Sequence, residues 1–272
     1  MKIVVENNVL VNVEVDYDND ISVKEFTVPD GVTEIANEAL GCLPSEVETL
    51  YIPKSVEKID EGAFFSEVST WEKLKKIVVE VGNKNYKSET GCLIDVKNST
   101  VMLGTENAII PDGTEKIGFE AFNFRKGLTE ITIPESVKII DFRAISFCPN
   151  LKKVTILGKD TNMDRLCFIW DTAIEEFNIP KESDYEFIDG ALIKKRGNIL
   201  LLVTDNGAIP STVKCVEKSS IVRYAKDIEI PESVEEFGDM SIILLGGSKL
   251  KIKKDSTIHK YAIEKNIPYE EI

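Results

Sequence analysis

The chain has 272 residues, a hydrophobic fraction of 43% and a formal net charge of −14 at pH 7. Its length and apolar content are enough for a sizeable core. The acidic balance disfavours nucleic-acid binding and attachment to anionic membranes, because both draw on clustered Lys and Arg. No run of about 18 apolar residues occurs, so no membrane insertion is expected. The first eight residues lack the apolar stretch of a secretion signal. This predicts a cytoplasmic protein, or a secreted or cell-surface one if a signal has been removed.

The first predicted element in chain order is an N-terminal hairpin that caps the structure over residues 1–28, with its turn at residues 16–20. Apolar residues at 9–11 and near 28 flank that polar turn, as in a hairpin. A single phrase then repeats along the chain: an apolar triplet ending in Ile-Pro, then Ser-Val, then an apolar residue. It occurs at residues 50–59, 131–140 and 228–237. Repetition of this kind indicates stacked, nearly identical coils that share one core.

The apolar residue before each Pro, or before its equivalent, marks one predicted coil. Ten such markers occur, most of them 21 to 24 residues apart: Val28, Ile52, Val79, Ile110, Ile133, Ile156, Ile179, Ile209, Ile230 and Ile252. Around each marker apolar residues alternate, which predicts a strand with one face in the core. The Pro ends the strand because it offers no ladder donor. The Val-x-x-Ile segment that follows is predicted to form the returning part of the same coil.

Two longer gaps between markers contain the same inserted segment. Eight residues between Tyr86 and Pro111 recur 99 positions later, between Tyr185 and Pro210. Each segment is predicted to form an apolar hairpin, with turns at residues 97–99 and 195–198. The coils at 161–174 and 237–245 depart from the phrase, which leaves their register open. At the end, residues 253–272 are predicted to form a cap, with a short helix that starts at 255–257 and ends at Asn266. Residues 1–272 are therefore expected to form a single solenoid domain.

The phrase resembles that of the BspA-like leucine-rich repeats, a bacterial surface-antigen type. The segment KIGFEAF at residues 116–122 matches it closely, and Cys42 and Cys148 lie at or near its cysteine position. The resemblance covers nearly the whole chain. It implies an α/β-type but mostly β, right-handed, curved leucine-rich-repeat solenoid with parallel strands. The family resemblance also implies a binding protein, often secreted or on the cell surface, that recognises host or matrix proteins.

Residues that could support chemistry are sparse, and no catalytic, metal or cofactor site is predicted. His259 is the only histidine, so multi-histidine metal sites are excluded, and a surface or cap role is favoured. The five cysteines are scattered and show no C-x-x-C spacing, which indicates free, buried thiols in a reducing compartment. The acidic run at 16–20 opens like a calcium loop, but Ile21 and Thr27 replace the required Gly and Glu. A solvated turn is the preferred interpretation of that run, and adventitious calcium binding stays open.

The predicted binding surface is formed by strand residues beside the core positions, because stacking sets equivalent residues about 4.8 Å apart on a solenoid face. Its candidate residues are Thr49, Tyr51, Lys76, Val78, Glu130, Thr132, Lys153, Thr155, Glu176, Asn178, Asp227 and Glu229. The hairpin tips are a second candidate surface. The favoured function is a non-enzymatic scaffold for a protein or peptide partner. The alternatives are a surface adhesin or antigen and, less favoured, a carbohydrate-active enzyme with two carboxyl groups about 5–10 Å apart in a pocket.

Overall fold

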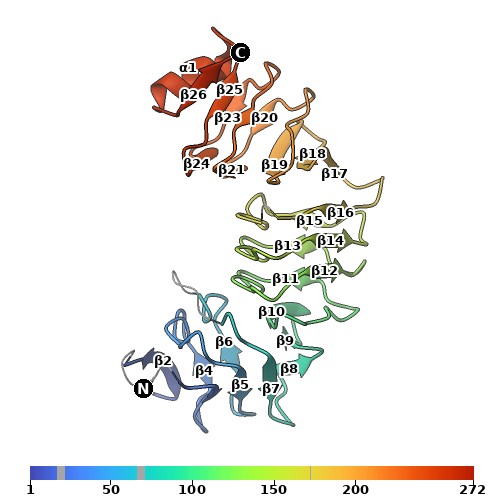
Figure 1. Ribbon diagram of the computed structural model, residues 1–272. Helices are drawn as coiled ribbons and strands as arrows, with labels where there is room; N and C mark the ends of the chain where they lie inside the picture. Colours follow the sequence, from blue (N-terminus) through green and yellow to red (C-terminus); the bar gives the residue numbers. More distant parts are fainter. Residues whose placement is uncertain (17–21, 66–70, 172) are drawn as a thin grey trace.

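The computed structural model describes residues 1–16, 22–65, 71–171 and 173–272. Stacked coils curve into a crescent, with the two chain ends at its opposite tips (Figure 1). The described residues contain one helix, α1 (Thr257–Glu264), and are otherwise strands and turns. The predicted mostly β solenoid with parallel strands is therefore confirmed.

The Ile-Pro segments form the longer strands of the solenoid, and together they make one face that we call the Ile-Pro face. Its strands are β3 (Glu25–Thr27), β5 (Thr49–Ile52), β7 (Lys76–Val79), β12 (Glu130–Ile133), β14 (Lys153–Ile156), β16 (Glu176–Asn178), β22 (Ile228–Glu229), β25 (Leu250–Ile252) and β26 (Tyr269–Glu271). They pair in parallel within three separate sheets, β3-β5-β7, β12-β14-β16 and β22-β25-β26. Ile131 aligns with Val154 and Phe177, and all three are buried. The markers Val28, Ile179 and Ile230 directly follow the last residues of β3, β16 and β22. Ile110 and Ile209 adjoin no strand, so those two strand predictions are wrong.

The returning Val-x-x-Ile segments form a second ladder of two-residue strands, which we call the short-strand face. Its strands are β4 (Glu34–Ile35), β6 (Lys58–Ile59), β11 (Lys116–Ile117), β13 (Ile139–Ile140), β15 (Asn162–Met163), β20 (Cys215–Val216) and β23 (Glu236–Phe237). β13 pairs with β15, so Met163 occupies the position of Ile140 in the preceding coil. β20 pairs with β23, which places Phe237 beside Val216. These pairings resolve the register of both degenerate coils.

Each inserted segment is a three-stranded antiparallel sheet. The first contains β8 (Tyr86–Glu89), β9 (Cys92–Asp95) and β10 (Thr100–Gly104), and the second contains β17 (Tyr185–Ile188), β18 (Ala191–Lys194) and β19 (Ile199–Val203). The predicted turns at 97–99 and 195–198 join the second and third strands. The two-stranded prediction missed β8 and β17. Their turns, at residues 90–91 and 189–190, have positive φ at both positions, as two-residue hairpin turns require.

The N-terminal cap is a hairpin of β1 (Lys2–Glu6) and β2 (Val9–Glu14), and β2 also pairs with β4. Its turn lies at Asn7 and Asn8, whose φ angles are 51° and 65°. Asn tolerates this left-handed region better than most residues. The turn predicted at 16–20 is therefore misplaced. Residues 17–21, which include most of the acidic run at 16–20, lie outside the described residues.

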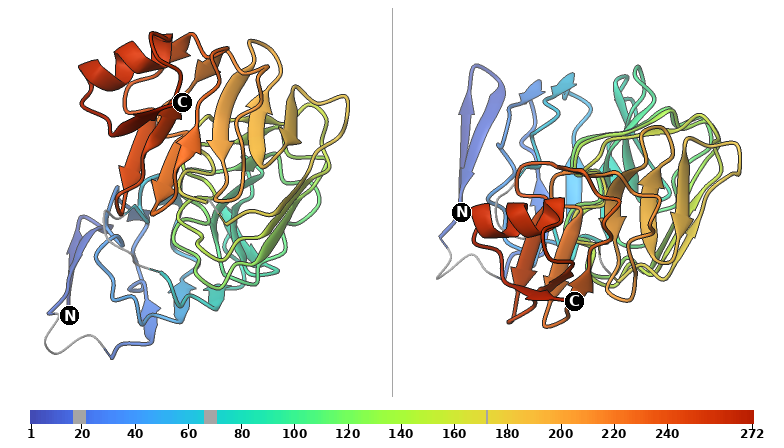
Figure 2. Two further views of the ribbon diagram at one scale, coloured as in Figure 1. Left: turned by 45° about the horizontal axis from the view of Figure 1, so that its top comes forward. Right: turned by 90° about the horizontal axis from the view of Figure 1, so that it is seen from above.

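The C-terminal cap agrees with the predicted helix. The Ser256 hydroxyl accepts a hydrogen bond from the backbone N–H of His259, and Asn266 follows the helix with φ 52°. Ile258 and Ala262 are buried and pack into the last part of the core. After the helix, β26 adds to β25 in parallel. Figure 2 shows α1 over the C-terminal tip, away from the N-terminal hairpin.

Candidate binding surfaces

The inner edge of the crescent is formed by loops rather than by the predicted strand surface. The loops that follow β11, β13 and β15 face the opening, as do β21 (Ile221–Tyr224) and β24 (Ile242–Leu245), whereas β12, β14 and β16 lie farther from it (Figure 1). The strand residues were predicted to form the concave face because concave solenoid surfaces are usual binding sites. The Ile-Pro face does not line the opening.

The structure brings the predicted strand residues side by side within each of the three sheets. Glu130 aligns with Lys153 and Glu176, and Thr132 aligns with Thr155 and Asn178. Most of the twelve are exposed or half-buried, but Thr49 is buried at 9% exposure, so its assignment to the exposed array is wrong.

One ion pair lies within this array. The Lys153 ammonium lies 3.1 Å from Glu176, and Asn178 donates a hydrogen bond to the same carboxylate at 2.7 Å. The pKa of Glu176 is lowered, first by Asn178 and then by Lys153. These contacts join the neighbouring strands β14 and β16.

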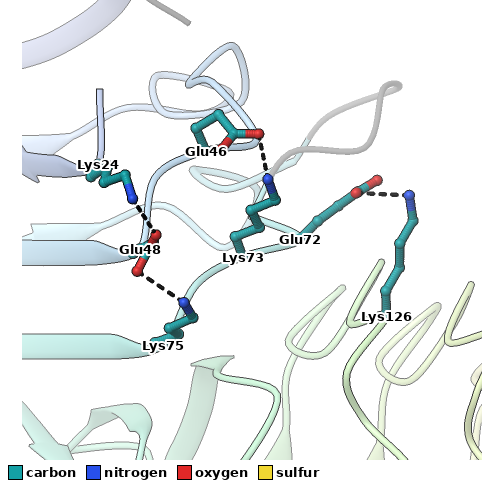
Figure 3. Close-up of polar contacts among 7 residues, drawn as sticks. All are labelled: Lys24, Glu46, Glu48, Glu72, Lys73, Lys75 and Lys126. Atoms are coloured by element: carbon teal, nitrogen blue, oxygen red, sulfur yellow. Dashed lines mark hydrogen bonds and ion pairs between the residues drawn. The ribbon is translucent and has the colours of Figure 1, made fainter. Parts of the chain in front are cut away.

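A second set of ion pairs joins coils at the corner where the Ile-Pro strands begin. Figure 3 shows its three groups: Lys24–Glu48–Lys75, Glu46–Lys73 and Glu72–Lys126. Glu48 bridges two lysines, with N···O distances of 3.1 and 2.9 Å. Its pKa is lowered, first by the hydrogen bond from Lys75 and then by that from Lys24. Alternating signs neutralise this corner, which indicates a role in coil-to-coil register.

Six aromatic residues form two rows, which we call the inner aromatic rows. One row contains Phe65, Phe119 and Phe142, and the other contains Phe124, Phe147 and Trp170. In the second row the ring centroids of Phe124 and Phe147 are 4.8 Å apart, and those of Phe147 and Trp170 are 5.8 Å apart. Five of the six are half-buried, and Phe142 is exposed. The second row lines a shallow hollow of about 300 Å³.

These rows carry backbone strain and a nearby cation. Phe124, Phe147 and Trp170 have φ angles of 58°, 55° and 68°, in the left-handed region that bulky residues rarely adopt. The guanidinium of Arg143 lies 3.0 Å from the Glu120 carboxylate and 5.3 Å from the centre of the Phe147 ring. These rows were not predicted from the sequence. An aromatic residue at the same position of successive coils, 23 residues apart, was the available signal.

A cavity of about 610 Å³ lies where the first inserted sheet interrupts the short-strand face. We call it the junction cavity. Its walls come from β6, β8, β10, β11 and β13 and from the turn between β9 and β10. The lining includes Ile59, Glu61, Met102, Lys116 and Phe119. No sequence pattern predicted this cavity, since its lining residues extend from Lys58 to Ile139 in the chain.

Two buried arginines close the inner ends of the inserted sheets. Arg125 donates hydrogen bonds to the carbonyl oxygens of Gly104 at 2.6 Å, Asn123 at 2.7 Å and Trp71 at 3.2 Å. Burial lowers the pKa of Arg125 to about 10, so it stays charged at neutral pH. Arg223 donates to Val203, the residue 99 positions after Gly104. The two side chains satisfy carbonyl groups where β10 and β19 end.

Two buried carboxyl groups also serve the fold. Burial raises the pKa of Glu120, although Arg143 opposes the shift. Burial raises the pKa of Asp171 well above its usual value, and one of its oxygens accepts the N–H of Cys148 at 2.6 Å. Neither residue lines the junction cavity.

The thiols and the histidine show no activated arrangement. Burial raises the pKa of Cys92 to about 12 and those of Cys148 and Cys167 well above the usual thiol value, so all three are poor nucleophiles. Cys215 has a free, half-buried thiol. His259 is 8% exposed beside Tyr269 in the C-terminal cap, and its Nδ1 accepts the N–H of Asp255.

Within the described ranges, no group of three or more His, Cys, Asp or Glu side chains is placed to hold a metal ion. Over the same residues, no helix has the length and apolar character needed to cross a membrane.

Stacked coils that share one spine define a repeat-protein scaffold. The chain belongs to the BspA type leucine rich repeat region family, which matches residues 3–90 and 102–196 in six copies. This confirms the resemblance carried by the Ile-Pro phrase. No curated protein matches the chain.

Several solved structures are similar to this chain at low identity. A leucine-rich repeat protein from Eubacterium ventriosum has 17% identity and a TM-score of 0.44, with 82% of this chain and 64% of that chain covered. A leucine rich cell surface protein from Faecalibacterium prausnitzii has 16% identity and a TM-score of 0.47, covering 90% and 74%. The pneumococcal vaccine antigen PcpA has 17% identity and a TM-score of 0.35, covering 92% and 78%. This chain thus spans 64% of the first of these proteins. The comparisons lend no support to the predicted cytoplasmic location.

Proposed function

We propose that this chain is a non-enzymatic scaffold that binds a partner protein along the inner edge of its crescent. The observation that carries the proposal is the pair of inner aromatic rows, with Arg143 over the Phe147 ring. Aromatic residues and Arg are enriched at protein interfaces and supply most of their binding energy. A partly exposed aromatic surface commonly marks an interaction site.

The coil geometry fixes the backbone of the second row. Its three residues have a left-handed backbone in successive coils, and the same conformation recurs at other coil turns, such as Glu38 and Met240. Here the coil stacking holds Phe124, Phe147 and Trp170 in one ordered row, so little side-chain freedom is lost on binding.

The non-enzymatic part of the proposal rests on how the unusual ionisable groups are used. An acid catalyst needs a carboxyl group with a raised pKa that faces a substrate cavity. Among the described carboxyl groups, burial raises the pKa of Glu120 and Asp171. Glu120 is paired with Arg143, and Asp171 is hydrogen-bonded to the Cys148 backbone. Both groups therefore support the fold. The single-domain assignment of residues 1–272 stays a prediction.

The test first identifies a partner by cross-linking and mass spectrometry, and then measures its affinity for matched variants. Phe147→Ser with Trp170→Ser removes two of the three rings of the second aromatic row, and Thr132→Ser with Asn178→Ser is the matched double variant on the Ile-Pro face. We expect the aromatic double variant to weaken binding by at least about 30-fold, because a hot-spot residue contributes about 2 kcal/mol or more. The Ile-Pro-face variant should bind as the unaltered chain does.

Melting temperatures of both variants provide the control for folding, since the aromatic side chains also pack against their coils. Equal affinity of the aromatic variant and the unaltered chain, with both folded, would refute binding at the inner edge. Weakening by the Ile-Pro-face variant alone would restore the strand surface as the binding site.

A further inference from the structure

The junction cavity exists because one rung of the short-strand face is missing. Among the described strands β6 pairs only with β4, so its other edge has no parallel neighbour. The hydroxyl of Tyr86 takes the place of the absent strand and accepts the N–H of Ile59 at 2.7 Å. An ion pair between Glu61 and Lys116, at 3.4 Å, spans the gap to β11. The remaining space is the cavity.

This open edge leaves a backbone acceptor unused. In the next intact rung, the carbonyl oxygen of Ile117 accepts the N–H of Asp141 at 3.0 Å. At the second junction, the Tyr185 hydroxyl donates to the carbonyl oxygen of Met163 at 3.3 Å. The equivalent acceptor at the first junction is the carbonyl oxygen of Ile59, to which no group in the described ranges donates a hydrogen bond. Ile59 is 5% exposed and lines the cavity. The carbonyl oxygen of Ile59 is therefore free to accept a hydrogen bond from a ligand that brings an N–H group.

Charge in the junction cavity also favours a cation. Four carboxylates line it: Asp60, Glu61, Asp95 and Glu115. Two of its three lysines are already neutralised. Lys58 lies 2.6 Å from Glu34 and 3.0 Å from Asp60.

Lys116 lies 2.6 Å from Asp141 as well as near Glu61. Burial alone would lower the pKa of Lys116, but these carboxylates raise it overall. With Glu34 and Asp141 included, six carboxylates surround three ammonium groups. Glu115 takes part in no ion pair within the described part of the chain.

The cavity also has an apolar side. Met102 and Phe119 form part of its lining, and Ile139 is 44% exposed at its border. Lys and Arg place their methylene stems against such surfaces while the charged group reaches a polar one. The lining therefore combines an apolar wall, an excess of carboxylates and an unused carbonyl acceptor.

We propose that the junction cavity binds a lysine or arginine side chain of the partner protein. This rests on the proposed function and names the chemistry of the partner. The ammonium or guanidinium group donates hydrogen bonds to the carbonyl oxygen of Ile59 and pairs with Glu61 and Glu115, and its stem packs on Met102 and Phe119. The net charge of −14 also speeds the approach of a basic partner. Phe119 belongs to both the cavity wall and the inner aromatic rows, which makes the two surfaces continuous.

The experiment titrates the isotopically labelled full chain with capped tripeptides and follows backbone amide shifts by NMR. The probes are acetyl-Ala-Arg-Ala-amide, acetyl-Ala-Lys-Ala-amide and their norleucine analogue, which keeps the stem and lacks the charge. We expect the two basic peptides to shift signals of residues 59–61 and 116–119, with the norleucine peptide at least about ten times weaker. Glu61→Gln with Glu115→Gln should reduce the affinity of the basic peptides by about 10-fold, and Glu229→Gln on the Ile-Pro face should not change it. Both cavity residues are exposed, so the double variant is expected to fold.

No shifts at millimolar peptide, or equal shifts with the norleucine peptide, would overturn this proposal. So would equal affinity of the double variant for the basic peptides. Failure here is distinguishable from failure of the proposed function. A partner that still depends on Phe147 and Trp170, without peptide binding in the cavity, refutes the cavity proposal alone. Peptide binding in the cavity with no dependence on the aromatic rows refutes the inner-edge surface alone.

Discussion

Arg125 provides the sharpest test of how the inserted sheets join the solenoid. It is 1% exposed, and its guanidinium donates to three backbone carbonyl groups, of Gly104, Asn123 and Trp71. Arg125→Leu fills much of the same space and removes every donor. Each buried acceptor left without a partner costs about 1–3 kcal/mol.

Arg125→Leu also removes a buried charge, and this offsets part of the loss, because desolvating an ion costs several kcal/mol even after relaxation. We therefore expect Arg125→Leu to lower the free energy of unfolding by about 3 kcal/mol. Arg223→Leu should lower it by less, because the carbonyl contacts of Arg223 are longer, at 3.0 to 3.4 Å. Arg196→Leu, at an exposed hairpin turn, should change it by about 0.5 kcal/mol or less.

Urea unfolding followed by circular dichroism measures all three variants, and the slope of the transition shows whether cooperativity is retained. Coincident midpoints for Arg125→Leu and Arg196→Leu would show that the carbonyl groups find other donors. The assigned role of Arg125 would then be wrong.

Three further predictions concern the core, a buried acid and the charged corner. Ile133→Asp should cost on the order of 3 kcal/mol or more, and the adjacent Thr132→Asp about 0.5 kcal/mol or less, because only Ile133 faces the core. Similar melting temperatures for the two variants would show that the assignment of Ile133 to the core and Thr132 to the surface is wrong. The folded-state pKa of Asp171 lies above its unfolded value, so the folded chain binds more protons above about pH 4 and loses stability as pH rises towards the folded-state pKa. Asp171→Asn should therefore flatten the dependence of the unfolding free energy on pH in acidic buffers. An unchanged slope would contradict the raised pKa of Asp171. Glu48→Gln should lower stability far less than Ile133→Asp, and 1 M salt should shrink its effect, because the pairs are exposed and screened.

The repeating phrase predicted most coils of the solenoid correctly, because strand formation there depends on residues that are close together in the chain. Alternating aliphatic residues and the following Pro define a strand and its end wherever they occur. The match at an offset of 99 residues located both inserted segments and their second turns. The capping helix was also predicted, because Ser256 and Asn266 favour helix ends through their own local chemistry.

Errors arose where one local signal competed with another. The Asn7–Asn8 turn was passed over in favour of the acidic run at 16–20, although Asn suits a left-handed two-residue turn. The strands β8 and β17 were missed because Tyr86 and Tyr185 were taken only as alignment points. Thr49 was assigned to the surface by alternation, yet the structure buries it.

By itself, the sequence determined that near-equivalent coils stack in parallel, because side chains repeating at a constant period bury their apolar faces only against copies of themselves. Which surfaces lie on the inner edge was decided by the tertiary structure alone. The inserted sheets interrupt the short-strand ladder, and this brings together Ile59, Tyr86 and Lys116. The spacing of residues along the chain does not predict these contacts, because they depend on how the two sheets pack in three dimensions.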